Sequence, residues 1–259
     1  MKRELRIFFS ALMFYTRIPC PDWVGHSEEL LGKSTKYFPL IGYIVAGVSV
    51  SVLFFSQLAL PVSVSIILSI LAGILTTGAF HEDGLADVCD GFGGGWSKTG
   101  ILEIMKDSRI GTYGTIGLVL VLLSRFYLLF ELSKVSLSYL FMTILVGHTL
   151  SRLNAASMIL IYDYARENGT GKSKPLAKKM SAGHYTVALI SGVIPLAVMT
   201  FLWSFHTFFV IIPLLLLLVY LGSYFRRWIG GFTGDCLGSV QQLSEILVYI
   251  FMLGLWKFI

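Results

Sequence analysis

Four carboxylates stand within one short stretch, HEDGLADVCDGF (81–92): Glu82, Asp83, Asp87 and Asp90. Asp83, Asp87 and Asp90 follow an i, i+4, i+7 spacing, which places them on one face of a helix. Like charges at this spacing repel one another, so a cation should compensate them, and neutralising one should leave the metal-free protein at least as stable. Hard carboxylate oxygens suit Mg²⁺ or Mn²⁺. The stretch predicts a divalent-metal site; the alternative is a solvated acidic helix end.

A second charged stretch, EIMKDSRIGTYG (103–114), combines Glu103 and Asp107 at i, i+4 with Lys106 and Arg109. Carboxylates can hold a metal while Lys and Arg neutralise phosphate oxygens, so this mixture is typical of a metal–phosphate complex. A surface helix with ordinary salt bridges is the alternative. Together the two stretches predict a divalent metal, Mg²⁺ or Mn²⁺, bound by their carboxylates beside a phosphate group.

The composition is that of an integral membrane protein. Of the 259 residues, 55% are hydrophobic and only 14% are charged, and the mean hydropathy is +0.77, far above that of ordinary soluble domains. We predict one all-α, membrane-embedded catalytic domain over residues 1–259, with an N-terminal amphipathic helix lying in the interface. Seven predominantly apolar windows are long enough to cross a bilayer: 39–58, 62–80, 112–132, 136–160, 184–203, 206–224 and 239–257.

The basic residues gather in alternate connections. They occupy the N-terminal arm and the loops at 81–111, 161–183 and 225–238, whereas the connectors at 59–61, 133–135 and 204–206 carry almost none. The positive-inside rule therefore places the N-terminus and the long loops in the cytoplasm of a multi-pass protein. The formal net charge of +5 reflects this topology, and we expect no nucleic-acid partner. A homo-oligomer is left open.

Charged residues inside the spans are costly. Arg125 and Arg152 lie in predicted spans, where an arginine costs roughly 2.5–3.5 kcal/mol and usually faces a polar cavity; snorkelling to an interface is the alternative. Glu245 is expected to face the bundle from the last span. The loop YARENGTGKSKP (164–175) offers Arg166 and Lys172 to an anionic substrate, although loop cations also serve topology.

In these motifs the chain resembles the adenosylcobinamide-GDP ribazoletransferase family. The resemblance covers nearly the whole chain and lies in TRIPCP (16–21), FPLIG (38–42), FHEDGLADVCDGFGGG (80–95), EIMKDSRIGTYG (103–114), YARENGTGK (164–172) and GGFTGDCLGS (230–239). It implies an enzyme of the bacterial or archaeal cytoplasmic (inner) membrane that needs Mg²⁺. Its substrates would be adenosylcobinamide-GDP and α-ribazole or α-ribazole 5′-phosphate, with GMP leaving.

On this basis a ribazole hydroxyl would attack the cobinamide-side phosphorus. The Mg²⁺ ion that the resemblance implies would be held by Asp83, Asp87, Asp90 and Asp107. We assign catalytic roles to Asp87, Asp90 and Asp107, of which Asp107 would accept the hydroxyl proton. We expect substrate contacts from the other charged residues of these motifs and spans: Arg17, Glu82, Lys106, Arg109, Arg125, Arg152, Arg166, Lys172 and Asp235.

Two rival functions remain at this point. The segment DVCDG (87–91) also matches the first part of the CDP-alcohol phosphotransferase signature, but the later Ala-Arg and the closing DxxxD are absent. A lipid-directed enzyme of that class would release CMP rather than GMP. A cation transporter would instead place its carboxylates at mid-bilayer depth and carry metal flux without turnover.

Overall fold

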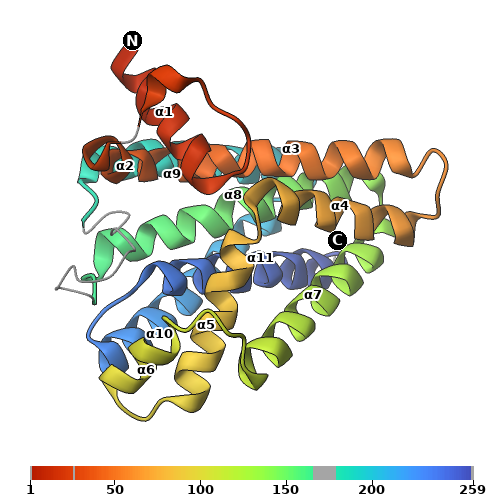
Figure 1. Ribbon diagram of the computed structural model, residues 1–259. Helices are drawn as coiled ribbons and strands as arrows, with labels where there is room; N and C mark the ends of the chain where they lie inside the picture. Colours follow the sequence, from red (N-terminus) through yellow and green to blue (C-terminus); the bar gives the residue numbers. More distant parts are fainter. Residues whose placement is uncertain (1, 26, 166–178, 258–259) are drawn as a thin grey trace.

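A computed structural model describes residues 2–25, 27–165 and 179–257 (Figure 1). Within these residues the secondary structure is helical, apart from an isolated bridge between Tyr164 and Phe232. The α-helices are α1 (Lys2–Tyr15), α2 (Glu28–Ser34), α3 (Phe38–Ser56), α4 (Val62–Thr77), α5 (Phe80–Gly94), α6 (Lys98–Ile104), α7 (Thr112–Ser133), α8 (Leu137–Ile161), α9 (Ala182–Leu202), α10 (Ile211–Ile229) and α11 (Gly234–Leu255). Short 3₁₀ helices occupy Asp22–Val24, Thr35–Tyr37 and Phe205–Val210.

The predicted membrane bundle is confirmed. Each of the seven apolar windows overlaps one helix: α3, α4, α7, α8, α9, α10 or α11. In the described part of the chain, six helices are long and apolar enough to cross a bilayer, and a seventh crossing is obtained if α4 and α5 are counted together. The expected N-terminal helix is α1, which ends before Arg17 and Pro19 and buries one side, including Ile7 and Tyr15.

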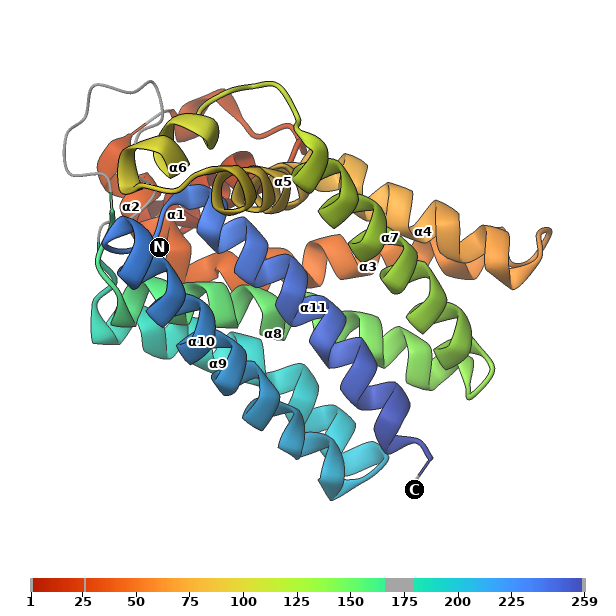
Figure 2. The same ribbon diagram turned by 90° about the horizontal axis from the view of Figure 1, so that it is seen from below.

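Helices α8 and α11 form the centre of the bundle. In the most apolar stretch of α8, 83% of the residues are buried, and in that of α11 67%, against 17% for α7. Helices α3 and α4 form an antiparallel hairpin on one side, and α7 crosses obliquely at the edge (Figures 1 and 2). Helix α7 therefore has the lowest buried share among the six long apolar helices.

The connections sort to two ends of the bundle. The α3–α4, α7–α8 and α9–α10 connections lie toward the same end as the C-terminus (Figure 2). Helices α1, α2 and α6 lie toward the other end. The charged loops and the short bare connectors thus separate in space as the charge pattern predicts.

Helix α5 departs from the sequence-based expectation of a loop that begins where the second span ends. It follows α4 at an angle of 87° and runs across neighbouring helices (Figure 1). The turn is made by Gly78 and Ala79, both left-handed, with φ of 67° and 57°. Because a non-glycine residue rarely adopts this conformation, the bend at Ala79 is held by the surrounding fold.

Close helix approach depends on glycine at several crossings. A Cβ atom on Gly42 of α3 would lie 2.6 Å from the carbonyl oxygen of His148 on α8, a backbone atom that cannot move aside. Gly47, five residues further along the same helix, is exposed and would meet nothing within 4 Å. The two glycines therefore differ in what they do for the fold.

Gly42→Ala should lower the apparent Tm of the purified protein, because the added methyl group forces α3 away from α8 at a cost of about 1–3 kcal/mol. Gly47→Ala is the matched control and should leave the Tm unchanged or raise it, since Ala is favoured over Gly in a helix by about 1 kcal/mol. Thermal melting in detergent measures both. Equal shifts for the two variants would contradict the α3–α8 contact.

Candidate active site

The α4–α5 bend brings Arg17 to the start of the acidic helix. The Arg17 amide donates to the carbonyl of Thr76 at 2.7 Å. Its side chain lies against Gly78, where any Cβ atom would collide with it. Arg17 is exposed, so this predicted substrate contact lies at the bend itself and remains accessible.

Helix α5 crosses the first turns of α11 at close range. A Cβ atom on Gly84 would lie 2.9 Å from the carbonyl oxygen of Asp235, and one on Gly238 would lie 3.1 Å from that of His81. Asp87 follows Gly84 by nearly one helical turn and therefore shares its face. The crossing thus places the backbone of Asp235 beside the carboxylate-bearing helix. Asp83 is exposed and Asp87 is half-buried.

Asp90 has a structural role that sequence reasoning did not anticipate. Its Oδ2 accepts a hydrogen bond from the Gly111 amide at 2.7 Å, and its Oδ1 accepts one from the Gly114 amide at 2.8 Å. These amides belong to the N-terminus of α7, which carries partial positive charge. The carboxylate therefore caps a neighbouring helix, and the prediction that neutralising it costs no stability is revised for Asp90.

Asp107 and Asp90 line one open pocket of about 470 Å³, together with Arg109, Gly94 and Tyr113. Arg109 donates to Asp107 through Nε at 3.0 Å and Nη2 at 2.6 Å. These bonds and the Arg109 amide lower the pKa of Asp107 to about 2. Asp107 is therefore ionised at neutral pH and is a weak proton acceptor. The structure brings the two acidic stretches together, with Lys106 and Glu103 exposed nearby in sequence.

The carboxylates that would hold Mg²⁺ are those of Asp83, Asp87, Asp90 and Asp107. No cluster of three or more His, Cys, Asp or Glu side chains that could hold a metal is found in residues 2–25, 27–165 and 179–257. Mg²⁺, however, is usually bound by one or two carboxylates with water and substrate phosphates rather than by a complete protein cage. Asp83 has no ion-pair partner among the described residues. The donor types fit the ion.

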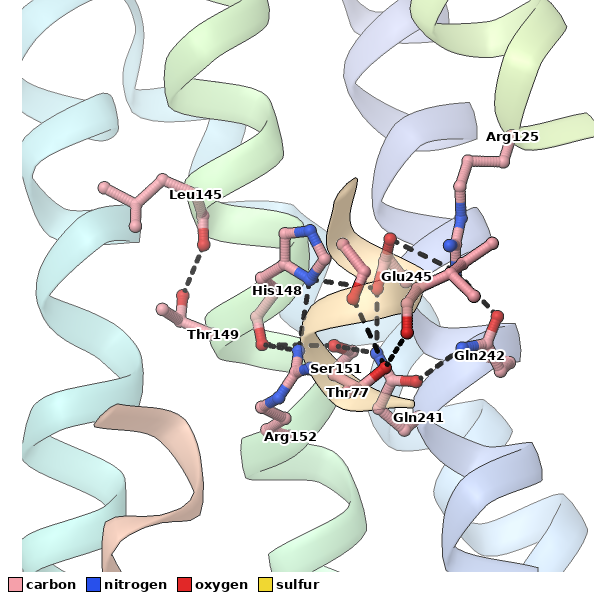
Figure 3. A network of polar contacts seen from close by, with 12 residues as sticks. Thr77, Arg125, Leu145, His148, Thr149, Ser151, Arg152, Gln241, Gln242 and Glu245 are labelled. Atoms are coloured by element: carbon pink, nitrogen blue, oxygen red, sulfur yellow. Dashed lines mark hydrogen bonds and ion pairs between the residues drawn. The ribbon is translucent and has the colours of Figure 1, made fainter. Parts of the chain in front are cut away.

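Arg125 joins three helices at the centre of a buried network, part of which Figure 3 shows. Its Nη2 donates to Oε1 of Gln242 at 2.6 Å and lies 3.3 Å from Oε1 of Glu245, both on α11. Its Nη1 lies 3.6 Å from Oε1 of Glu82 on α5, and Gln242 Nε2 donates to that same oxygen at 3.0 Å. The exposed fractions are 5% for Arg125, 8% for Glu82 and 1% for Glu245.

Helix α8 extends this network (Figure 3). Arg152 Nη1 donates to the His148 carbonyl at 3.0 Å and lies 3.1 Å from His148 Nδ1. Gln241 Nε2 donates to Glu245 Oε2 at 2.8 Å and to Ser151 Oγ at 3.1 Å. The same Nδ1 lies 3.4 Å from Oε2 of Glu245, so His148 connects Arg152 to Glu245. The network thus contains two arginines and two glutamates, and Arg125 contacts both carboxylates.

These partners change the interpretation of three predicted substrate contacts. All three side chains, those of Glu82, Arg125 and Arg152, are buried. Arg125 is paired with both glutamates, and Arg152 is bonded to His148. Their contact with substrate stays a prediction. Glu245, which was expected to face the bundle from the last span, lies 11 residues after the start of α11 and is buried.

Sequence reasoning missed His148, Gln241 and Gln242. A signal was present: polar side chains inside a span are costly and face the bundle interior. His148 with Arg152 and Gln241 with Glu245 each repeat at i, i+4, which places each pair on one helix face. Arg166 and Lys172, by contrast, lie outside the described residues.

Known proteins similar to this chain match it over nearly its whole length. The family model described as cobalamin-5-phosphate synthase matches residues 7–253. The adenosylcobinamide-GDP ribazoletransferase of Shewanella frigidimarina is 44% identical over 97% of this chain and 95% of its own length. The proteins of that name from Shewanella woodyi and Leptospira interrogans are each 45% identical, over 98% and 99% of this chain and 98% of their own lengths.

No solved structure matches the chain. The family model and these relatives nonetheless span every motif described above, from TRIPCP to GGFTGDCLGS. The chain belongs to the cobalamin-5-phosphate synthase family.

Proposed function

We propose that this protein is the membrane transferase that joins adenosylcobinamide-GDP to α-ribazole or α-ribazole 5′-phosphate in cobalamin assembly. The observation that carries the proposal is the family match over residues 7–253, which includes both acidic stretches. A bond forms between the ribazole hydroxyl oxygen and the cobinamide-side phosphorus, the bond from that phosphorus to the GMP oxygen breaks, and the hydroxyl proton is released.

We further propose that the reaction requires Mg²⁺ held by Asp83, Asp87, Asp90 and Asp107. When bound, the ion would neutralise the diphosphate and the departing GMP. Asp90 reaches this task with both oxygens already bonded to α7 amides, so it orients α7 as well as contributing charge. The low pKa of Asp107 suits an ionised ligand better than a proton acceptor.

The cations of the same end would bind the phosphate oxygens. Arg109 lines the pocket that Asp90 and Asp107 share, and Lys106 and Arg17 are exposed. Positioning and charge neutralisation supply most of the acceleration in phosphoryl transfer. Asp235, beside α5 at the α11 crossing, is proposed as a further substrate contact.

The purified protein should release GMP when given adenosylcobinamide-GDP, α-ribazole and Mg²⁺, because the guanylate is the leaving group. A matched CDP-alcohol donor should give no CMP. Nucleotide release is measured by chromatography, with EDTA as the control that removes the metal. Turnover that EDTA leaves unchanged would contradict the metal requirement, and CMP release would support the lipid-directed alternative.

Asp83→Asn and Asp90→Asn should each lower GMP release by about 10²–10³, the usual loss when one charge-stabilising contact is removed from such a site. Their stabilities should differ. Asp90→Asn loses charge-assisted bonds to the α7 amides and should cost about 1–2 kcal/mol without metal. Asp83→Asn, which has no described partner, should stay within about 0.5 kcal/mol of the parent.

Melting curves in detergent, with and without Mg²⁺, separate the two effects. Added Mg²⁺ should stabilise the parent by mass action and both variants much less. An Asp90→Asn variant that melts with the parent would show that the α7 cap contributes nothing. Parental GMP release by both variants would remove these aspartates from the site.

We also propose that the protein lies in the cytoplasmic (inner) membrane with the N-terminus and the charged end in the cytoplasm. Single cysteines at Ser97 and Gly234, both exposed, should resist an impermeant thiol reagent on intact cells, in a background without native cysteines. Lys134→Cys, on the α7–α8 connection at the other end, should be labelled. The opposite pattern would invert the topology; Ser173, a third suitable position, lies outside the described residues.

A further inference from the structure

The carboxylate-bearing helix is held at two separate points on α7. At the N-terminus of α7, the Asp90 carboxylate accepts hydrogen bonds from the Gly111 and Gly114 amides. Deep in the bundle, Glu82 meets Arg125, which lies 13 residues after the first residue of α7, or about 20 Å along the helix. Two such contacts fix both the separation and the rotation of one helix relative to the other.

The deep contact also ties α5 to α11. Gln242 donates to Glu82 and accepts from Arg125, while Arg125 is paired with Glu245. Only a planar, multiply donating guanidinium can serve these partners together; an ammonium is a single point charge. Oε2 of Glu82 has no hydrogen-bond partner in the described residues, so the hold on α5 depends on its other oxygen, Oε1.

We propose that Arg125 is a positioning residue that sets the place of α5, and with it Asp83, Asp87 and Asp90, through Glu82. Its role in catalysis rests on the function proposed above, but its role in holding α5 in position does not. The sequence suggested that Arg125 binds substrate, and the two roles predict different behaviour. A substrate contact acts on KM or turnover without moving α5, whereas a positioning residue acts on α5 itself.

The alkylation rate of Cys89, a native cysteine on α5, reports on whether α5 stays packed against α7. The Sγ atom of Cys89 packs against α7 at Gly117, where an added Cβ would lie 2.6 Å from it. Cys89 is half-buried, and Cys236, in the first turn of α11, is fully buried. Loosening α5 should expose Cys89 and leave Cys236 covered, whereas general unfolding exposes both.

The experiment compares the parent with Arg125→Lys, Glu82→Gln and Asn154→Ala in detergent. Asn154 is a matched control: it is buried on α8 and donates to the Leu214 carbonyl and to Ser244, away from α5. Rates of N-ethylmaleimide alkylation at Cys89 and Cys236 are read by mass spectrometry. The Arg125 and Glu82 variants should raise the Cys89 rate at least tenfold with Cys236 unchanged. Asn154→Ala should lower the Tm without a selective rise at Cys89.

GMP release gives the second readout. In both α5-network variants kcat should fall at least tenfold while KM for adenosylcobinamide-GDP changes less than threefold. A parental Cys89 rate in both variants overturns the proposal, as does a parallel rise at Cys236, which would indicate general destabilisation. Lost activity with a parental Cys89 alkylation rate would indicate that Arg125 contacts the substrate instead. If the parent itself releases no GMP, the proposed function fails, and the alkylation rates still decide whether Arg125 seats α5.

Discussion

The enclosure of Arg125 with Glu82 and Glu245 is the constraint on which the arrangement of the bundle depends. Removing one member of a buried ion pair leaves an uncompensated charge, at a cost of about 3–5 kcal/mol. The guanidinium, the two carboxylates and Gln242 come from α5, α7 and α11. These helices must therefore adopt one relative placement, because any shift that separates the groups strands a charge in an apolar interior.

The aspartates of α5 depend on this buried network for their position, because Glu82 lies on the same helix. The helix begins at a strained, left-handed Ala79, and a strained residue persists only where its surroundings determine it. Arg17 at the bend, Gly84 against Asp235 and Glu82 in the network supply those surroundings. The carboxylates of Asp90 and Asp107, which line one pocket, can thus be held near one another despite their repulsion.

The sequence predicted the membrane crossings because the thickness of the hydrocarbon core sets the length of apolar sequence that a crossing helix needs. It also predicted the helical face of Asp83, Asp87 and Asp90, since that depends only on local spacing. The 87° bend was missed because no proline stands there and its direction is set by contacts with α7 and α11. The partners of Arg125 were missed because Gln242 lies 117 residues away along the chain. Spacing identifies a face, but it does not reveal what that face meets.

Helix α7 shows why polar contacts have this role in a membrane bundle. Lipid chains are as apolar as leucine, so no hydrophobic force drives helices together within the bilayer, and association depends on packing and on polar contacts. Helix α7 packs against α4, α5, α8 and α11, but only 17% of its most apolar stretch is buried. Its position is then governed by Asp90 at its first turn and by Arg125 within it. Helix α5 and helix α7, which has the lowest buried share among the six long apolar helices, are therefore placed relative to each other by these two polar contacts.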